Sequence, residues 1–258
     1  MTARVIVAGE TNVGMKRTHN EDRFSVIDES HLYVVADGMG GHASGEVASQ
    51  MAIDTLQEFF QATSADPEAT WPYKMDKSRG YEENRLITSV KLANLRIFET
   101  AQRDPKLRGM GTTLVAILVV DDGVLIAHVG DSRVYRLRDG KLEQLTEDHS
   151  LLNDYIKMKK LSEEEIKNFP HKNVIVRALG MKESVKVDTS LDPPKPGDIY
   201  ILCSDGLAGP ISDDEIHEIS LQHTTDLKAA CSALIDRANA NGGPDNVTVV
   251  CVKVVGLG

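Results

Sequence analysis

The chain has 258 residues, with 29 lysines and arginines against 39 aspartates and glutamates, which gives a formal net charge of −10 at pH 7. This acidic balance argues against nucleic acid or an anionic membrane surface as the main partner, because both attract clustered basic residues. A chain of this length can bury a large core without disulfide bonds or a structural metal, and its sequence contains no apolar run long enough to span a bilayer. We therefore expect one soluble domain over residues 1–258. Three cysteines without a pairing pattern predict a cytoplasmic location, and a monomer is expected.

Strand-like segments open the chain, and two long helices follow them. The predicted strands of this part are 4–9, 23–28 and 32–37. Apolar residues then recur at helical spacing through 43–60 and again through about 82–98. The polar segment between the helices, 63–80, holds two prolines and is predicted to be a loop insertion. Its tryptophan, Trp71, is expected to cover a local apolar patch, with the docking of a partner as the alternative.

The second half of the chain is richer in strands. The predicted strands are 112–120, 124–129, 134–138, 174–179, 185–191, 199–203 and 247–254. Aspartate–glycine turns at 121–123 and 139–140 are typical of hairpins. The predicted helical segments are 150–169, 213–221 and 226–240. Because strands come in blocks separated by helix pairs, and not in strict alternation with helices, the pattern favours a layered sandwich over a doubly wound sheet.

Acidic residues stand where predicted strands end. Asp37, Asp131 and Asp205 each follow an apolar run, and Asp245 opens the last strand, so an antiparallel placement would bring it to the same rim. Carboxylates gathered at one edge lose hydration and repel each other, at a cost of several kcal/mol per ion unless a cation compensates. Oxygen ligands without cysteine suit Mg²⁺ or Mn²⁺. Any one aspartate alone would fit a strand-end cap or a turn, but their recurrence favours a metal site.

Two further features surround these aspartates. Glu21 and Asp22 are neighbours before a predicted strand and should point to opposite faces, so only one is expected to bind a metal while the other orients groups by hydrogen bonds. Glycines at 38, 40 and 41 follow Asp37 and let the backbone approach an ion or a phosphate closely. His42 lies just beyond them and is suited to moving a proton.

Eight short motifs follow one another along the chain: Gly14 with 17–22, then 37–42, 111–113, 130–133, 148–150, 177–180, 204–207 and 245–248. With these motifs in this order, the chain resembles metal-dependent protein serine/threonine phosphatases of the PP2C (PPM) type, in the compact catalytic-domain form found in bacteria. Each motif alone is weak, but eight in order over nearly the whole chain are specific. The resemblance implies an α+β fold, a four-layer α-β-β-α sandwich in which two packed antiparallel sheets are flanked by helix pairs.

The resemblance also implies two Mn²⁺ or Mg²⁺ ions, and in bacterial members a weaker third one. The implied metal ligands are Glu21, Asp37, the carbonyl of Gly38, Asp205, Asp245 and, with Asp205 for the third ion, Asp131. Asp37 would bridge the two main ions. Asp22 and Asn246 would lie behind the ligands and orient them.

The implied activity is hydrolysis of phosphoserine and phosphothreonine monoesters in proteins by direct attack of a water or hydroxide that bridges the two ions. Arg17 offers a planar fork for the phosphate oxygens, and His42 is the candidate acid that protonates the leaving side chain. His149 is a second histidine of interest, although a turn residue before the next helix is the favoured interpretation. Segment 153–172 corresponds to the family's flap beside the metals, and its charge pattern alone would also fit a solvated helical hairpin. The implied partners are proteins phosphorylated by a Ser/Thr kinase system.

The three cysteines offer a different phosphatase chemistry only superficially. Cys203, Cys231 and Cys251 each stand in an apolar stretch, which predicts reduced core thiols. Cys231 and Arg237 have the C-x5-R spacing of cysteine-dependent phosphatases, but no glycine lies between them to form the phosphate loop that such chemistry needs. Two rival functions stay open: another two-metal phosphoesterase, such as a phosphodiesterase or nuclease, and a phosphoprotein-binding module without turnover.

Overall fold

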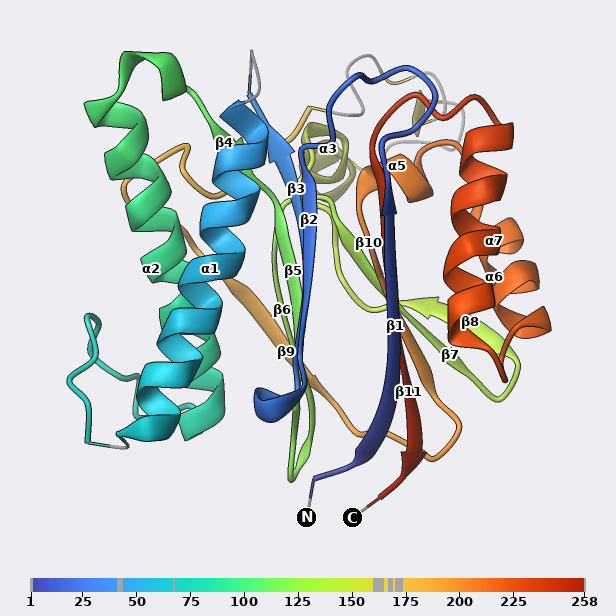
Figure 1. Ribbon diagram of the computed structural model, residues 1–258, viewed down its shortest axis with the longest axis horizontal. Helices are drawn as coiled ribbons and strands as arrows, with labels where there is room; N and C mark the ends of the chain where they lie inside the picture. The colour runs from blue at the N-terminus through green and yellow to red at the C-terminus, as the bar shows by residue number, and fades with distance from the viewer. Residues whose placement is uncertain are drawn as a thin grey trace.

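Two antiparallel β-sheets pack face to face, and a pair of long helices covers the outer face of each (Figure 1). The computed structural model describes residues 2–40, 44–66, 68–159, 165–166, 169 and 174–257. The strands are β1 (Arg4–Asn12), β2 (Asp22–Ile27), β3 (Leu32–Met39), β4 (Gly111–Thr112), β5 (Leu114–Val120), β6 (Gly123–Val129), β7 (Arg133–Arg138), β8 (Lys141–Gln144), β9 (Asp188–Asp192), β10 (Ile199–Cys203) and β11 (Val247–Gly256). The helices are α1 (Ser44–Ala65), α2 (Tyr81–Arg103), α3 (Leu151–Lys159), α5 (Asp205–Ala208), α6 (Asp213–Gln222) and α7 (Leu227–Ala240). The predicted α+β sandwich of four layers is confirmed.

Each sheet has its own helix pair. One sheet has the strand order β1-β11-β10-β7-β8 and is covered by α6 and α7 (Figure 1). The other has the order β2-β3-β5-β6-β9, with β4 paired to β3, and is covered by α1 and α2. Because the strands are antiparallel, chain segments far apart in sequence end at the same rim of the sandwich.

Three apolar cores separate the four layers, and the alternation of side chains along the strands creates them. In β3, Leu32, Val34 and Ala36 face the core under α1 and α2, whereas Tyr33 and Val35 face the core between the two sheets. A third core lies between the other sheet and its helices, and it contains the buried Cys231, as predicted. The period of two in a strand therefore sets which residues join which layer.

The loop insertion is shorter than predicted. Helix α1 continues through residues 63–65, because Thr63 lies buried and its hydroxyl donates to the carbonyl of Phe59 one turn earlier. The described part of the loop, residue 66 and 68–80, contains no helix or strand. Trp71 packs edge-on against Phe59, with ring centroids 5.6 Å apart, and lies 5.2 Å from Tyr81. The expectation that Trp71 covers an apolar patch is confirmed.

The second half departs from the sequence prediction at three strands. Residues 174–179 are not a strand, because their described pairing is confined to single bridges at Ile175 and Leu179. The turn at 139–140 is confirmed, with φ of 51° at Asp139 and 73° at Gly140, but the strand that follows it, β8, was not predicted. The predicted strand 185–191 begins only at residue 188. Of the helix predicted over 150–169, residues 151–159 form α3 and residues 165–166 are also helical, whereas 160–164 and 167–168 lie outside the described residues.

Among the described residues, no helix combines the length and the apolar character that crossing a membrane requires.

Candidate metal and phosphate site

Four acidic residues lie where strands begin or end at one rim of the sandwich, the rim at which β3 and β10 end, at the top of Figure 1. Asp37 lies near the end of β3, and Asp205 follows β10 as the first residue of α5. Asp245 precedes β11, which runs antiparallel to β10 and so returns the chain to this rim. Asp131 lies in the connection from β6 to β7. The carboxyl groups of Asp37 and Asp205 lie close enough to act on each other's pKa, so strand-end carboxylates meet at this rim as the sequence predicts.

Burial and mutual repulsion raise the pKa values of Asp37, Asp131 and Asp205. At Asp37 burial has the largest effect, and the charges of Asp22, Asp205 and Asp131 add to it. Burial likewise raises the pKa of Asp131 to about 7, with further contributions from Asp205 and Asp148. The Oδ1 atom of Asp131 is buried and has no hydrogen-bond partner in the described part of the chain. Crowded oxygen ligands with an unsatisfied buried acceptor fit divalent cations of the Mg²⁺ or Mn²⁺ type.

Glu21 and Asp22 point into different surroundings, as predicted. The Glu21 Oε1 atom accepts a hydrogen bond of 3.2 Å from the backbone N–H of Gly45, at the start of α1. Asp22 is almost fully buried, and its Oδ2 atom accepts from the hydroxyl groups of Ser204 and Thr248, both at 2.7 Å. Burial raises the pKa of Asp22 to about 6, although these two hydrogen bonds oppose the shift. Asp22, from one sheet, is thus held by the other sheet.

Gly38 lies where no other residue fits. A Cβ atom at this position would lie 2.2 Å from the carbonyl oxygen of Gly45 and 2.5 Å from that of Glu21. The N–H of Gly38 donates to the same Glu21 carbonyl at 3.2 Å. The glycine therefore allows the end of β3 and the start of α1 to pack close together, beside the predicted ligands.

Arg17 and Asn246 form the outer side of the site. The Nη2 atom of Arg17 lies 2.6 Å from Oδ2 of Asp245, and half of the arginine side chain is exposed. The Asn246 side chain donates to the carbonyls of Val13 and His19, both at 2.9 Å, and accepts from the N–H of Glu21 at 2.8 Å. Asn246 thereby fastens the loop that carries Arg17. The predicted acid His42 lies outside the described residues.

Two threonines hold Asp37, a role that the sequence did not reveal. The N–H of Asp37 donates to Oγ1 of Thr113 at 3.2 Å, and its carbonyl accepts from the hydroxyl of Thr112 at 2.9 Å. Thr113 also shares a hydrogen bond of 2.6 Å with the hydroxyl of Ser132, next to Asp131. These residues formed one of the motifs, but a threonine in a motif does not show what it contacts across 76 residues of chain.

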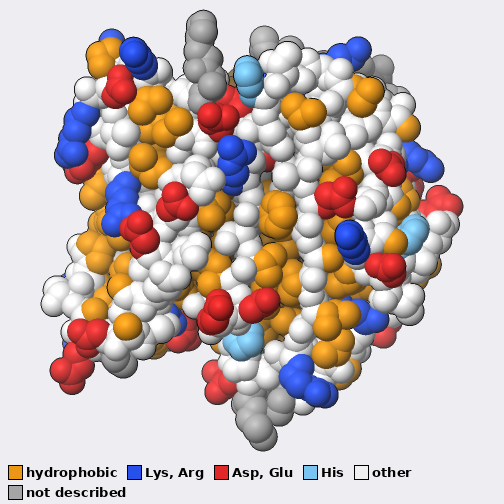
Figure 2. Space-filling model, in the orientation of Figure 1, with side chains coloured by type: hydrophobic (Ala, Val, Ile, Leu, Met, Phe, Trp, Pro, Cys, Tyr) orange, Lys and Arg blue, Asp and Glu red, His pale blue; other side chains and the backbone are white. Residues whose placement is uncertain are grey.

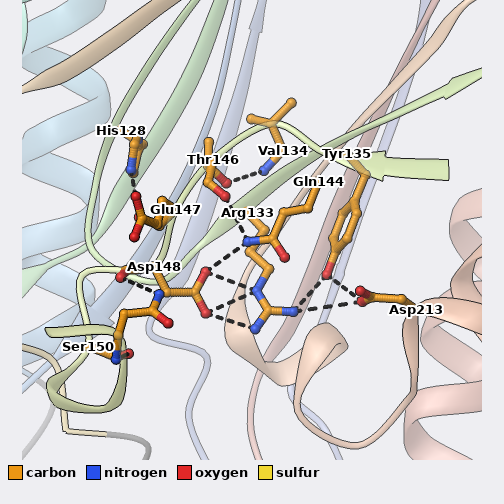
Figure 3. Close-up of polar contacts among 11 residues, drawn as sticks. His128, Arg133, Val134, Tyr135, Gln144, Thr146, Glu147, Asp148, Ser150 and Asp213 are labelled. Carbon is orange, nitrogen blue, oxygen red and sulfur yellow. Dashed lines mark hydrogen bonds and ion pairs between the residues drawn. The ribbon is translucent and has the colours of Figure 1, made fainter. Parts of the chain in front are cut away.

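A cavity of about 280 Å³ opens beside Asp131 and Asp205. On its wall, Arg133 grips Asp148 with its Nε and Nη2 atoms, the Nη2–Oδ2 distance being 2.7 Å (Figure 3). Arg133 also donates to the hydroxyl of Tyr135 at 2.8 Å. The bidentate pair neutralises the arginine, so the cavity keeps the negative charge of the two rim aspartates.

The face shown in Figure 2 carries basic and acidic side chains in alternation. In the groove between α1 and α2, for example, Arg96 pairs with Glu58 at 2.6 Å and Arg103 with Glu99 at 2.9 Å. On this face the described basic residues therefore form no continuous patch of the kind that binds a phosphate backbone.

An α-β-β-α sandwich with carboxylates crowded at one rim defines a class of metal-dependent hydrolase, and comparison with known proteins identifies the family. Residues 14–248 match the family model described as Protein phosphatase 2C, so the chain belongs to the protein phosphatase 2C family. It is 39% identical to the "Serine/threonine phosphatase stp" of Listeria monocytogenes, over 94% of this chain and 93% of that protein. It is 38% identical to the "Serine/threonine protein phosphatase PstP" of Mycobacterium tuberculosis, over 96% of this chain and 45% of that longer protein.

Solved structures agree with this assignment. The crystal structure of the Mycobacterium tuberculosis phosphatase PstP has a TM-score of 0.83 at 36% identity, covering 98% of this chain and 99% of that chain. The catalytic domain of PstP in complex with two manganese ions has a TM-score of 0.78 at 35% identity, covering 99% and 100%. Members of this family depend on metal ions, which agrees with the carboxylate-rich rim.

Proposed function

We propose that this serine/threonine phosphatase hydrolyses phosphoserine and phosphothreonine monoesters in proteins, using two Mn²⁺ or Mg²⁺ ions and a weaker third ion. The observation that carries the proposal is the meeting of Asp37, Asp205, Asp131 and Asp245 at one rim, where burial and repulsion raise the pKa of the first three. The names of the relatives support the substrate class, and the manganese ions in the PstP complex support the ion type.

The proposed ligands are those that the motifs indicated. Asp37 would be shared by both main ions, with Glu21 and the Gly38 carbonyl on one side and Asp205 and Asp245 on the other. Asp131 would serve the weaker ion together with Asp205. When bound, the ions supply positive charge that neutralises the substrate phosphate and acidifies a water molecule at the site.

The chain's own residues would bind the phosphate and handle the proton. Arg17 stands at the rim with half of its side chain exposed and beside the carboxylates, so its fork can reach phosphate oxygens while it keeps contact with Asp245. Asn246 holds the loop of Arg17 in place through its contacts with Val13 and His19. His42 lies five residues after Asp37 in the sequence and is proposed to protonate the leaving serine or threonine oxygen.

Proteins phosphorylated by a Ser/Thr kinase system are the proposed substrates. The cytoplasmic location, the monomeric state and the exclusion of nucleic acid as a partner stay predictions from the sequence. The acidic net charge of −10 and the interspersed charges on the face in Figure 2 support a protein substrate over a nucleic acid.

A phosphothreonine peptide assayed with added Mn²⁺ tests the proposal. We expect turnover that a chelator abolishes and that Asp205→Asn lowers by about two orders of magnitude, the usual effect of losing one electrostatic stabiliser. Asp214→Asn, on the exposed side of α6, makes the same chemical change away from the site and should leave turnover intact.

Two results would contradict it. Binding of the phosphopeptide without turnover at saturating Mn²⁺ would indicate a binding module. A preference for a phosphodiester over the monoester peptide would indicate a phosphodiesterase or nuclease.

A further inference from the structure

A histidine pair with an aspartate lies next to the turn that carries Asp131. One possible ligand atom from each of His128, His149 and Asp188 falls within 4.8 Å of the others, which is the spacing of a metal site. The hydrogen bonds already in place argue against a metal. The Nδ1 atom of His149 accepts a hydrogen bond of 3.0 Å from the backbone N–H of Gly130, so the neutral ring carries its proton on Nε2. That nitrogen lies 3.1 Å from Oδ2 of Asp188 and 3.0 Å from Nη1 of Arg177. With its proton on Nε2 the ring donates to the carboxylate, Arg177 is only a neighbour that pairs with the same aspartate, and no lone pair is left for an ion.

The surrounding charges support the same conclusion. Arg177 and Lys186 each lie 3.2 Å from an oxygen of Asp188, so its negative charge is already compensated by two cations. Burial, together with His128 and Arg177, lowers the pKa of His149 to about 4. The ring is therefore neutral near pH 7. Because the Gly130 N–H needs Nδ1 as its acceptor, the proton lies on Nε2, which donates to Asp188.

His149 forms hydrogen bonds with both backbone groups of one residue, Gly130, and so holds the peptides on either side of it. Its backbone N–H donates to the carbonyl of Gly130 at 2.9 Å, while its ring accepts from the N–H of the same residue. Gly130 has φ of +114°, and a Cβ atom there would lie 2.6 Å from Cβ of Thr113, so the turn is tightly constrained. Asp131 is the next residue. The two hydrogen bonds between His149 and Gly130 therefore set the direction in which the chain presents the Asp131 carboxylate.

The segment that carries His149 is itself anchored. Arg133 forks onto Asp148, and the carbonyl of Glu147 faces Nε2 of His128 at 2.9 Å (Figure 3). The rings of His128 and His149 stack with centroids 4.6 Å apart and planes 19° apart. A histidine held on three sides can transmit a fixed position to the peptide that it binds.

We propose that His149 is a positioning residue, whose Nδ1 atom holds the Gly130 peptide so that the Asp131 carboxylate is aimed into the rim of the metal site. The inference rests on the proposed function, in which Asp131 binds the weaker ion. His149 does not touch the substrate or the main ligands. Its effect should therefore be seen in metal binding at the weak site.

Two substitutions at His149 distinguish the roles of its two ring nitrogens. In His149→Asn, the side-chain oxygen can take the place of Nδ1 and accept from Gly130. In His149→Gln, the longer amide reaches the place of Nε2 and keeps Asp188, but it leaves the Gly130 N–H without its acceptor. Both variants lose the stacking on His128, so each controls for the packing loss of the other.

Calorimetric Mn²⁺ titration and the Mn²⁺ dependence of phosphopeptide turnover provide the readouts. We expect His149→Gln to weaken Mn²⁺ binding at the weakest site about tenfold and to raise the Mn²⁺ concentration for half-maximal turnover by a similar factor. For His149→Asn, both changes should be less than about a third as large. Asp131→Asn should show the same change, and adding His149→Gln to it should cause little more, because both act on one group.

Equal Mn²⁺ profiles for the two His149 variants, with thermal stability as their only difference from the wild type, would overturn the positioning role and leave the proposed function intact. A wild-type protein without Mn²⁺ binding or turnover would overturn both proposals. If His149→Gln does not fold, the exchange of the Gly130 amide with solvent, followed by NMR in the wild type, decides the question. Slow exchange, like that of neighbouring strand amides, supports a stable hydrogen bond from the Gly130 N–H to His149. Fast exchange overturns the proposal.

Discussion

Asp131→Asn should stabilise the metal-free protein at neutral pH, although it removes a proposed ligand. The side chain of Asp131 is only 8% exposed, its Oδ1 atom has no hydrogen-bond partner among the described residues, and its pKa is about 7. A carboxylate in this position must be ionised against both burial and the neighbouring charges of Asp205 and Asp148. An asparagine has the same shape without the charge.

The magnitude follows from the difference between the folded and unfolded pKa values. A rise from the usual value of 3.8 to about 7 corresponds to about 4 kcal/mol as an upper estimate. Because the folded state binds this proton more tightly than the unfolded chain does, the wild-type protein loses this stability as the pH rises from about 4 to about 7. Asp131→Asn removes this loss. Its advantage in unfolding free energy should therefore be near zero at about pH 4 and should grow to a constant value above about pH 7.

Thermal unfolding in a chelator, followed by circular dichroism between pH 4 and pH 8, measures this difference. For a chain of this size each kcal/mol shifts Tm by about 2–4 °C, so the upper estimate of about 4 kcal/mol puts the variant above the wild type by at most about 8–16 °C at pH 8. Saturating Mn²⁺ should reverse the order, because the wild type gains more from the ions. Asp122→Asn, on the exposed turn between β5 and β6, is the control for the loss of one charge. A Tm difference that does not change with pH would refute the reasoning.

Two further predictions concern the loop of Arg17 and the cysteines. Asn246→Ala removes three hydrogen bonds that hold residues 13–21, and steady-state kinetics at saturating Mn²⁺ should show kcat/KM for the phosphopeptide about tenfold lower, mainly through KM. An unchanged KM would contradict the role of this loop in phosphate binding. The three cysteines are buried, and burial raises the pKa of Cys203 to about 12, so Ellman's reagent should modify them only as fast as the protein opens. Rapid modification of the folded protein would contradict their core positions.

The layers and the rim could be predicted from the sequence because both depend on local patterns. The alternation in β3 assigns Tyr33 and Val34 to opposite cores, and a strand that ends on an acid places it at a rim. Asp245 could be placed beside Asp205 from the sequence because β11 runs antiparallel to β10, so its start lies at the rim where β10 ends. These features survive in the structure because burial enforces them along every strand.

The remainder depends on contacts that no local pattern encodes. Residues 174–179 read as a strand, but Val174 and Val176 are exposed and the segment bonds to loop residues such as His149. The sequence pattern does not predict strand β8, because its four residues are exposed or half-buried and mostly polar. The hydroxyl of Thr113 and the ring of His149 act on peptides 76 and 19 residues away, and either side chain alone would fit a turn. Long-range polar pairing is decided by the packing of the layers, and the sequence shows it only as a motif without a role.

The position of the rim at the junction of the two sheets links metal binding to the stability of the whole sandwich. Asp22 and Asp37 pair across β2 and β3 of one sheet, whereas Asp205 and Asp245 flank β10 and β11 of the other. Without ions, contacts such as the Ser204 hydroxyl on Asp22 and the Arg17 guanidinium on Asp245 offset only part of the repulsion across this junction. Cations bound between the carboxylates would replace that repulsion with attraction from both sheets at once. The same residues that make the site competent for phosphate chemistry therefore make the metal-free sandwich weakest at this end, and the pH and Mn²⁺ dependence of its unfolding should report on the site directly.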